Sequence, residues 1–294
     1  MTTSTTTTDR SVLVDADWLA EHLFDPAVRV VEVDVSPTAY ADWHINGAVL
    51  WNIYTDLKDP NYQLVDNRSL EMLLARSGIT PDMTIVFYGY APALGFWLMT
   101  LYGHADVRIL DCSRETWQSA GHPWSTADTA VLPAAGYPLG SPDIELRATL
   151  GVVSDAIEDP SVTLVDVRST AEYSGERFWP SGGMEPNGRP GRVPGAIHQP
   201  LDGLYAVSGA FRPPEELRRV FAATDLDDDG ALITYCTVGG RAATAWFVLT
   251  YLLGRPNVRV YDGSWAEWGR NPSTSVQSDN PKSTGGNRHV RTDS

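Results

Sequence analysis

Cysteine, positive charge and long apolar runs are all scarce in this sequence. Its 294 residues include only two cysteines, too few for a disulfide framework, which indicates a reducing compartment. Lysine and arginine number 22 against 37 acidic residues, and the formal net charge of -15 argues against nucleic acid or an anionic membrane as a general partner. No apolar run has the length that spans a bilayer, and the threonine-rich start lacks the basic and apolar blocks of a signal peptide. We therefore expect a soluble, cytoplasmic protein.

The chain does contain enough apolar side chain for about two domains of ordinary size. Its hydrophobic fraction is 43%, and it has ten tryptophans. Short β-branched runs predict strands at 28–33, 84–89 and 107–111, and stretches of helical spacing predict helices at 16–23 and 70–77. Strands that alternate with helices in this way predict an α/β fold, with a mainly parallel sheet flanked by helices.

The same pattern then starts again. Four landmarks return in the same order, which indicates a duplication. The matching segments are 28–34 with 162–168, 44–49 with 192–197, 84–89 with 231–236, and 106–117 with 257–268. We predict a disordered lead-in at 1–11, a first domain at 12–125, a linker at 126–143, a second domain at 144–272 and a disordered tail at 273–294.

The two copies differ where chemistry is expected, because Cys236 in the second copy corresponds to Gly89 in the first. Cys236 ends a predicted strand and precedes a loop with Gly239 and Gly240, which leads into an apolar helix. The first N–H groups of a helix have no intrahelical acceptor, and a glycine loop can turn its own N–H groups toward an anion. A cysteine placed there ionises readily, because these groups stabilise the thiolate. The first copy lacks the cysteine and has a shorter segment after it, so we expect it to be inactive.

Five motifs stand out in the second copy: the Cys-x-x-Gly-x-Arg-Ala loop at 236–242, Asp-Val-Arg at 166–168, Glu-Tyr at 172–173, Arg-Val-Pro-Gly-Ala at 192–196 and Tyr-Asp-Gly-Ser-Trp at 261–265. Together with the two-copy layout, these motifs resemble those of the tandem-domain rhodanese-type sulfurtransferases, the family of thiosulfate and 3-mercaptopyruvate sulfurtransferases. The resemblance covers nearly all of the globular chain, and the family's inactive first copy matches the Gly89/Cys236 difference.

The resemblance implies a sulfur transfer in two half-reactions. The Cys236 thiolate takes the outer sulfur of a small anionic donor, thiosulfate being favoured and 3-mercaptopyruvate next, and becomes a persulfide. Cyanide or a thiol, including that of a thioredoxin-like or sulfur-carrier protein, then accepts the sulfur. No metal or organic cofactor is implied.

Several residues are candidates for binding the donor. Arg241 either holds the anionic donor or braces the loop against a carboxylate, and both interpretations stay open. Arg189 and Arg192 precede the turn that carries donor-binding residues in related enzymes; the alternative for each is ordinary surface charge. The loop N–H groups are expected to stabilise thiolate and persulfide; they belong to Thr237, Val238, Gly239, Gly240 and Ala242.

Other residues are assigned to structural support. Cys112 corresponds to Gly263 rather than to Cys236, which favours a packed small residue over a redox partner. The six histidines show no metal-ligand spacing. The residues expected to support the site are Asp166, Arg168, Asp262 and Trp265.

Two rival functions are compatible with a cysteine loop before a helix. A cysteine phosphatase needs five residues between cysteine and arginine, whereas 237–240 supplies only four, so the loop is too short to encircle a phosphate. A binding module of the same fold without turnover is the second rival. The loss of the cysteine in the first copy fits that class, but the retention of Cys236 in the second does not.

Overall fold

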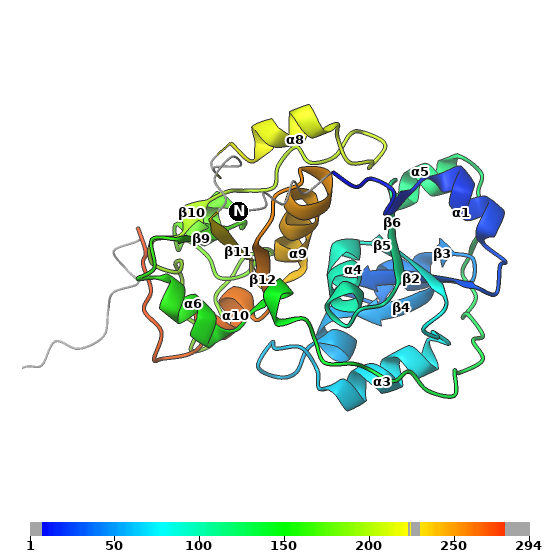
Figure 1. Ribbon diagram of the computed structural model, residues 1–294, viewed down its shortest axis with the longest axis horizontal. Helices are drawn as coiled ribbons and strands as arrows, with labels where there is room; N and C mark the ends of the chain where they lie inside the picture. The colour runs from blue at the N-terminus through cyan, green and yellow to red at the C-terminus, as the bar shows by residue number, and fades with distance from the viewer. Residues whose placement is uncertain (1–7, 223, 225–229, 280–294) are drawn as a thin grey trace, which may run out of the picture.

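The structure, a computed structural model, describes residues 8–222, 224 and 230–279, and it contains two similar α/β domains side by side (Figure 1). The first sheet has the strand order β1-β6-β5-β2-β4 and is parallel throughout. Its strands are β1 (Leu13–Val14), β2 (Val28–Asp34), β4 (Val49–Asn52), β5 (Thr84–Gly89) and β6 (Asp106–Leu110). A separate antiparallel pair joins β3 (His44–Ile45) to β7 (Trp124–Ser125).

Helices cover both faces of this sheet, as a parallel sheet requires. Asp15 and Asp66 begin two of them, because each side chain accepts a hydrogen bond from an N–H of the first turn. Pro92 begins a third at the position where proline's missing N–H costs nothing. The helices are α1 (Ala16–His22), α2 (Thr38–Asp42), the π-helical turn η1 (Ile53–Leu57), α3 (Asn67–Arg76), α4 (Pro92–Leu101) and α5 (Arg114–Ser119).

The second sheet repeats the arrangement of the first. Its order is β8-β12-β11-β9-β10, again parallel throughout, and each strand has a counterpart in the first copy. Its strands are β8 (Arg147–Ala148), β9 (Val162–Asp166), β10 (Ile197–His198), β11 (Ala231–Tyr235) and β12 (Val258–Tyr261). The helices are the 3-10 turn η2 (Ile144–Leu146), α6 (Leu150–Ala156), α7 (Thr170–Tyr173), α8 (Pro214–Val220), α9 (Gly240–Phe247), the π-helical turn η3 (Val248–Leu252) and α10 (Ser264–Trp268). The predicted fold class, two α/β domains with mainly parallel sheets, is confirmed.

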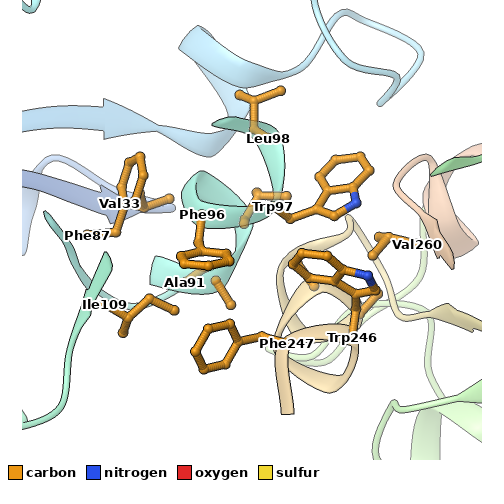
Figure 2. Close-up of a cluster of buried hydrophobic side chains, with 14 of the residues drawn as sticks. Val33, Phe87, Ala91, Phe96, Trp97, Leu98, Ile109, Trp246, Phe247 and Val260 are labelled. Atoms are coloured by element: carbon orange, nitrogen blue, oxygen red, sulfur yellow. The ribbon is translucent and has the colours of Figure 1, made fainter. Parts of the chain in front are cut away.

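The two domains share one apolar core along the contact between α4 and α9 (Figure 2). Phe96 lies 4.9 Å from Phe247 and 6.2 Å from Trp246, measured between ring centroids. All three side chains are almost fully buried. Burial of this many aromatic rings is a large contribution to stability, so the relative placement of the domains is part of the fold.

The chain outside the two sheets is partly fixed to them. No helix or strand lies between Ser125 and Ile144, where the linker was expected. Residues 273–279, expected to belong to a disordered tail, form hydrogen bonds with the second domain, including a backbone bridge between Arg192 and Gln277. Residues 1–7 and 280–294 lie outside the described residues. Within the described part, no helix is both long and apolar enough to cross a bilayer.

Candidate active site

Cys236 lies directly after β11, at the carboxyl end of the central strand of the second sheet. Its side chain is 1% exposed. Gly239 has a φ of 96°, a left-handed conformation that suits glycine, and its N–H donates to Sγ of Cys236 at 3.2 Å. The next N–H groups begin α9, where they have no intrahelical acceptor. The loop therefore directs the Gly239 N–H toward the sulfur, as an anionic sulfur needs.

Arg241 binds a carboxylate of its own domain. Its two terminal nitrogens donate to the two oxygens of Glu172 at 3.0 and 2.8 Å, and one of them also donates to Oγ1 of Thr237 at 2.8 Å. Thr237 in turn donates to Glu172 at 2.6 Å. The guanidinium thus links the cysteine loop to α7.

Glu172 is fully buried, yet it is held in its charged form. Burial by itself would raise the pKa of Glu172, but the hydrogen bond and charge of Arg241, with hydrogen bonds from Thr237 and Ser169, outweigh burial and lower that pKa to about 2. Ser169 contributes through a capping box at the start of α7. The carboxylate is the centre of the network that fixes one side of the loop.

The turn that follows β12 fixes the other side of the loop. The N–H of Cys236 donates to Oγ of Ser264 at 3.1 Å, and the N–H of Trp265 donates to the carbonyl of Cys236 at 3.0 Å. The N–H of Ala266 donates to the carbonyl of Thr237 at 2.9 Å. Ser264 has a φ of 52°, which is strained for a residue other than glycine. The backbone on both sides of the sulfur is thereby set by residues 264–266.

The first domain supplies one wall of a small cavity at Cys236, of about 40 Å³. Tyr54 and Tyr90 are 41% and 58% exposed and stand at this cavity. The residues that line it are Val35, Ile53, Tyr54 and Tyr90 from the first domain, and Pro180, Cys236, Thr237, Val238, Gly240 and Arg241 from the second. The candidate site therefore lies between the two domains.

Arg189 and Arg192 are engaged elsewhere in the second domain. Arg189 donates to the carbonyl of Thr274 at 2.6 Å and to further carbonyls at the end of α10. Arg192 pairs with Asp279 at 2.9 Å and stacks on Tyr173. Neither is among the described residues that line the cavity at Cys236.

The residues assigned to structural support are buried, and they form ion pairs or belong to the hydrophobic core. Arg168 and Asp166 are both fully buried and pair at 2.6 Å, and the guanidinium lies 4.6 Å from the ring centroid of Trp265. Asp262 is 1% exposed and binds Arg147 of its own domain and Lys58 of the first domain.

The corresponding position in the first copy has no room for a cysteine. Gly89 has a φ of 103°, and a Cβ there would lie 2.9 Å from Cγ of Glu32 and 3.0 Å from the carbonyl of Val33. Cys112 lies near this position, and burial raises the pKa of its thiol to about 11, which disfavours a second reactive thiolate. Among the described residues, no group of three histidine, cysteine or acidic side chains could hold a metal ion.

Sequence reasoning missed three contributors to the site: Glu172 as the partner of Arg241, and the two tyrosines. Glu172 could have been predicted from the sequence. A serine at 169 with a glutamate three residues later is the signature of a capping box, which marks the start of a helix. Tyr54 and Tyr90 had no such signal, since they come from the copy without the cysteine.

Comparison with known proteins places these observations in a family. The model of the rhodanese-like domain matches twice, at residues 15–120 and 149–271. A Mycolicibacterium smegmatis protein named "Putative thiosulfate sulfurtransferase" is 40% identical over 264 residues, which are 88% of this chain and 94% of that protein. A Haloferax volcanii protein of the same name is 36% identical over 281 residues, which are 92% of this chain and 98% of that protein.

Solved structures show the same arrangement of domains. The anaerobic ergothioneine biosynthesis enzyme from Chlorobium limicola, in complex with its natural substrate trimethyl histidine, superimposes with a TM-score of 0.79 at 25% identity, covering 92% of this chain and 71% of that one. A variant structure named for the enzyme EanB, in which ergothioneine is covalently linked with a cysteine persulfide, gives a TM-score of 0.76 at 27% identity, again with 92% and 71% covered. With two matching domains and relatives of this identity over almost the whole length, the chain belongs to the rhodanese-like family and is a sulfurtransferase with two copies of the domain.

Proposed function

We propose that this chain moves a sulfane sulfur through a persulfide on Cys236, with thiosulfate as the favoured donor and 3-mercaptopyruvate next. The observation that carries the proposal is the hydrogen bond from the Gly239 N–H to Sγ of Cys236 at 3.2 Å, at the head of α9. Preorganised donors of this kind stabilise both a thiolate and a persulfide anion. The names of the relatives favour thiosulfate.

The first half-reaction forms one sulfur–sulfur bond and breaks another. The Cys236 thiolate attacks the outer sulfur of thiosulfate, the sulfur–sulfur bond of the donor breaks, and sulfite leaves with the electron pair. With 3-mercaptopyruvate, a carbon–sulfur bond breaks instead, and pyruvate leaves once its enolate takes up the thiol proton. In the second half-reaction, cyanide or a thiolate attacks the outer sulfur of the persulfide, and the Cys236 thiolate returns.

Arg241 is assigned to bracing the loop rather than to gripping the donor. Both of its terminal nitrogens are engaged with Glu172, and that pairing neutralises its charge. We assign recognition of the donor to the loop N–H groups at the head of α9, and the cavity wall of Tyr54 and Tyr90 to limiting its size. Since the reaction needs a free thiol, we place it in the reducing cytoplasm.

The test is the intact mass of the protein after incubation with each donor. Thiosulfate is expected to add the mass of one sulfur atom, which reductant removes, and Cys236→Ala is expected to gain none. Steady-state rates with both donors at matched concentration then rank them. No gain in mass with either donor would favour the binding module, and turnover of a chromogenic phosphate ester that Cys236→Ser abolishes would favour the phosphatase.

A further inference from the structure

Each copy extends a short hairpin across the domain interface. In the first copy, Lys58 pairs with Leu64 in an antiparallel bridge, and the hairpin lies on the turn after β12. The N–H of Leu64 donates to Oδ2 of Asp262 at 3.2 Å. The hairpin thus touches the turn that fixes the cysteine loop.

The second copy makes the equivalent contact with the turn after β6 of the first copy. Tyr205 pairs with Phe211 in an antiparallel bridge, and the N–H of Phe211 donates to Oδ1 of Asp111 at 2.7 Å. Because Asp111 corresponds to Asp262 in the repeat, Tyr205 is the counterpart of Lys58. The copy that holds the cysteine therefore receives a lysine where the copy without a cysteine receives a tyrosine.

The Lys58 ammonium is buried beside the cysteine loop. Its side chain is 1% exposed, and Nζ donates to the carbonyl of Asp262 at 2.8 Å and to the carboxylate at 3.2 Å. Burial and the charge of Arg147 lower the pKa of Lys58, while Asp262 and the charge of Cys236 favour the ammonium. A buried ammonium is costly unless it is paired and hydrogen-bonded, and Asp262 meets both needs.

The Asp262 peptide also touches the loop directly. A Cβ at Gly239 would lie 2.9 Å from the Asp262 carbonyl oxygen and 3.4 Å from its Cα, so the two backbones are in close contact. Gly239 is the residue whose N–H donates to Sγ of Cys236. A chain of contacts therefore runs from Nζ of Lys58 through the Asp262 carbonyl to Gly239 and the sulfur.

We propose that Lys58, from the copy without a cysteine, is a positioning residue for Cys236. Its ammonium fixes the Asp262 carbonyl, which in turn holds the Gly239 N–H on Sγ, and its charge adds to the field that favours a sulfur anion. The proposal rests on Cys236 as the nucleophile of the proposed function. Its test uses alkylation of the thiol, which needs no sulfur donor, so that a failed proposal on Lys58 and a failed proposal on sulfur transfer can be told apart.

The experiment compares Lys58→Met with wild type; Asp262 keeps Arg147 as a partner in this variant, so the buried carboxylate stays paired. The rate of Cys236 alkylation by iodoacetamide is measured from pH 6 to pH 9 in a Cys112→Ser background. Relative to wild type in that background, Lys58→Met is expected to react roughly tenfold more slowly at neutral pH, the factor that the loss of one charge-assisted hydrogen bond carries. Its pH profile is expected to shift upward. Tyr205→Met, at the counterpart position, is the matched control and is expected to leave the rate unchanged.

Thermal unfolding of each variant separates positioning from folding. Equal rates and equal pH profiles for Lys58→Met and wild type, with both folded, would overturn the proposal and leave Lys58 as a purely structural contact. An equal loss of rate in Tyr205→Met would also overturn it, because that change does not touch the turn after β12. Where Lys58→Met has no cooperative unfolding transition, Lys58→Gln replaces it, with the same expected and refuting results.

Discussion

The Glu172 carboxylate offers the sharpest quantitative prediction, because it is buried, charged and hydrogen-bonded to both the loop and Arg241. Glu172→Gln removes the charge but keeps the shape. The amide cannot receive both terminal nitrogens of Arg241 and the hydroxyls of Thr237 and Ser169 as the carboxylate does. It leaves a partly buried guanidinium without its anion, and such a loss is destabilising.

The magnitude follows from the lowered pKa. A carboxyl with a pKa near 4.5 in the unfolded chain and about 2 in the folded one contributes roughly 3 kcal/mol to the free energy of unfolding at neutral pH. Because the folded-state pKa is depressed, the whole contribution is present above pH 4.5. It is lost as the pH falls toward 2, and about half of it or less remains at pH 3.

The assay is urea unfolding of wild type and Glu172→Gln at pH 7, pH 4 and pH 3. We expect the variant to be less stable by roughly 3 kcal/mol at pH 7, with the gap closing toward pH 3. The exposed neighbour Glu176 is the matched control, and Glu176→Gln is expected to leave the stability within about 0.5 kcal/mol of wild type at every pH. A gap between wild type and Glu172→Gln that stays constant with pH would refute the assignment of the lowered pKa to the Arg241 network.

Two further predictions concern the loop and the domain interface. Gly239→Ala is expected to lower the rate of sulfur loading roughly a hundredfold, because a Cβ would push against the Asp262 carbonyl and displace one preorganised N–H from Sγ. Gly195→Ala, with a φ of 77° and open space around it, controls for backbone strain alone, and equal loading rates in the two variants would contradict the argument. Trp246→Ala is expected to cost about 3–5 kcal/mol in urea unfolding while the protein still unfolds in one transition, since this ring joins both domains. The half-exposed Trp124 serves as the comparison, and a cost below about 1 kcal/mol for Trp246→Ala would indicate that the domains are held together elsewhere.

Much of the fold could be predicted because local sequence patterns mark its strands, and because the same patterns occur in both copies. The run 84–89 reads as a strand from its own β-branched and aromatic residues, and β5 has those bounds. The start of the next helix is harder to predict from local pattern: α4 begins at Pro92, because proline, a residue typical of loops, is also favoured in the first turn of a helix.

The site could be predicted only where its residues are neighbours in the sequence. The cysteine loop is continuous, so Cys236 and its glycines could be recognised from spacing alone. The choice between two roles for Arg241 could not be made, because the side chain that receives it is 69 residues away. Tyr54, Tyr90 and Lys58 are farther still, and they reach the loop only through the packing of one domain on the other.

That packing gives a physical reason for the chain to keep a copy that has no cysteine. The isolated second domain would expose the aromatic side of α9, where Trp246 and Phe247 are now almost fully buried. Exposure of these apolar rings to water is unfavourable, so the domains are more stable together. Separation would also open the cavity at Cys236, since Tyr54 and Tyr90 belong to the first domain. Water would then reach a sulfur that is now 1% exposed, and the N–H groups of the loop would act in a higher dielectric, where each contributes less to an anion. The first copy has a glycine where the second has Cys236, yet its side chains form one wall of the cavity around that sulfur.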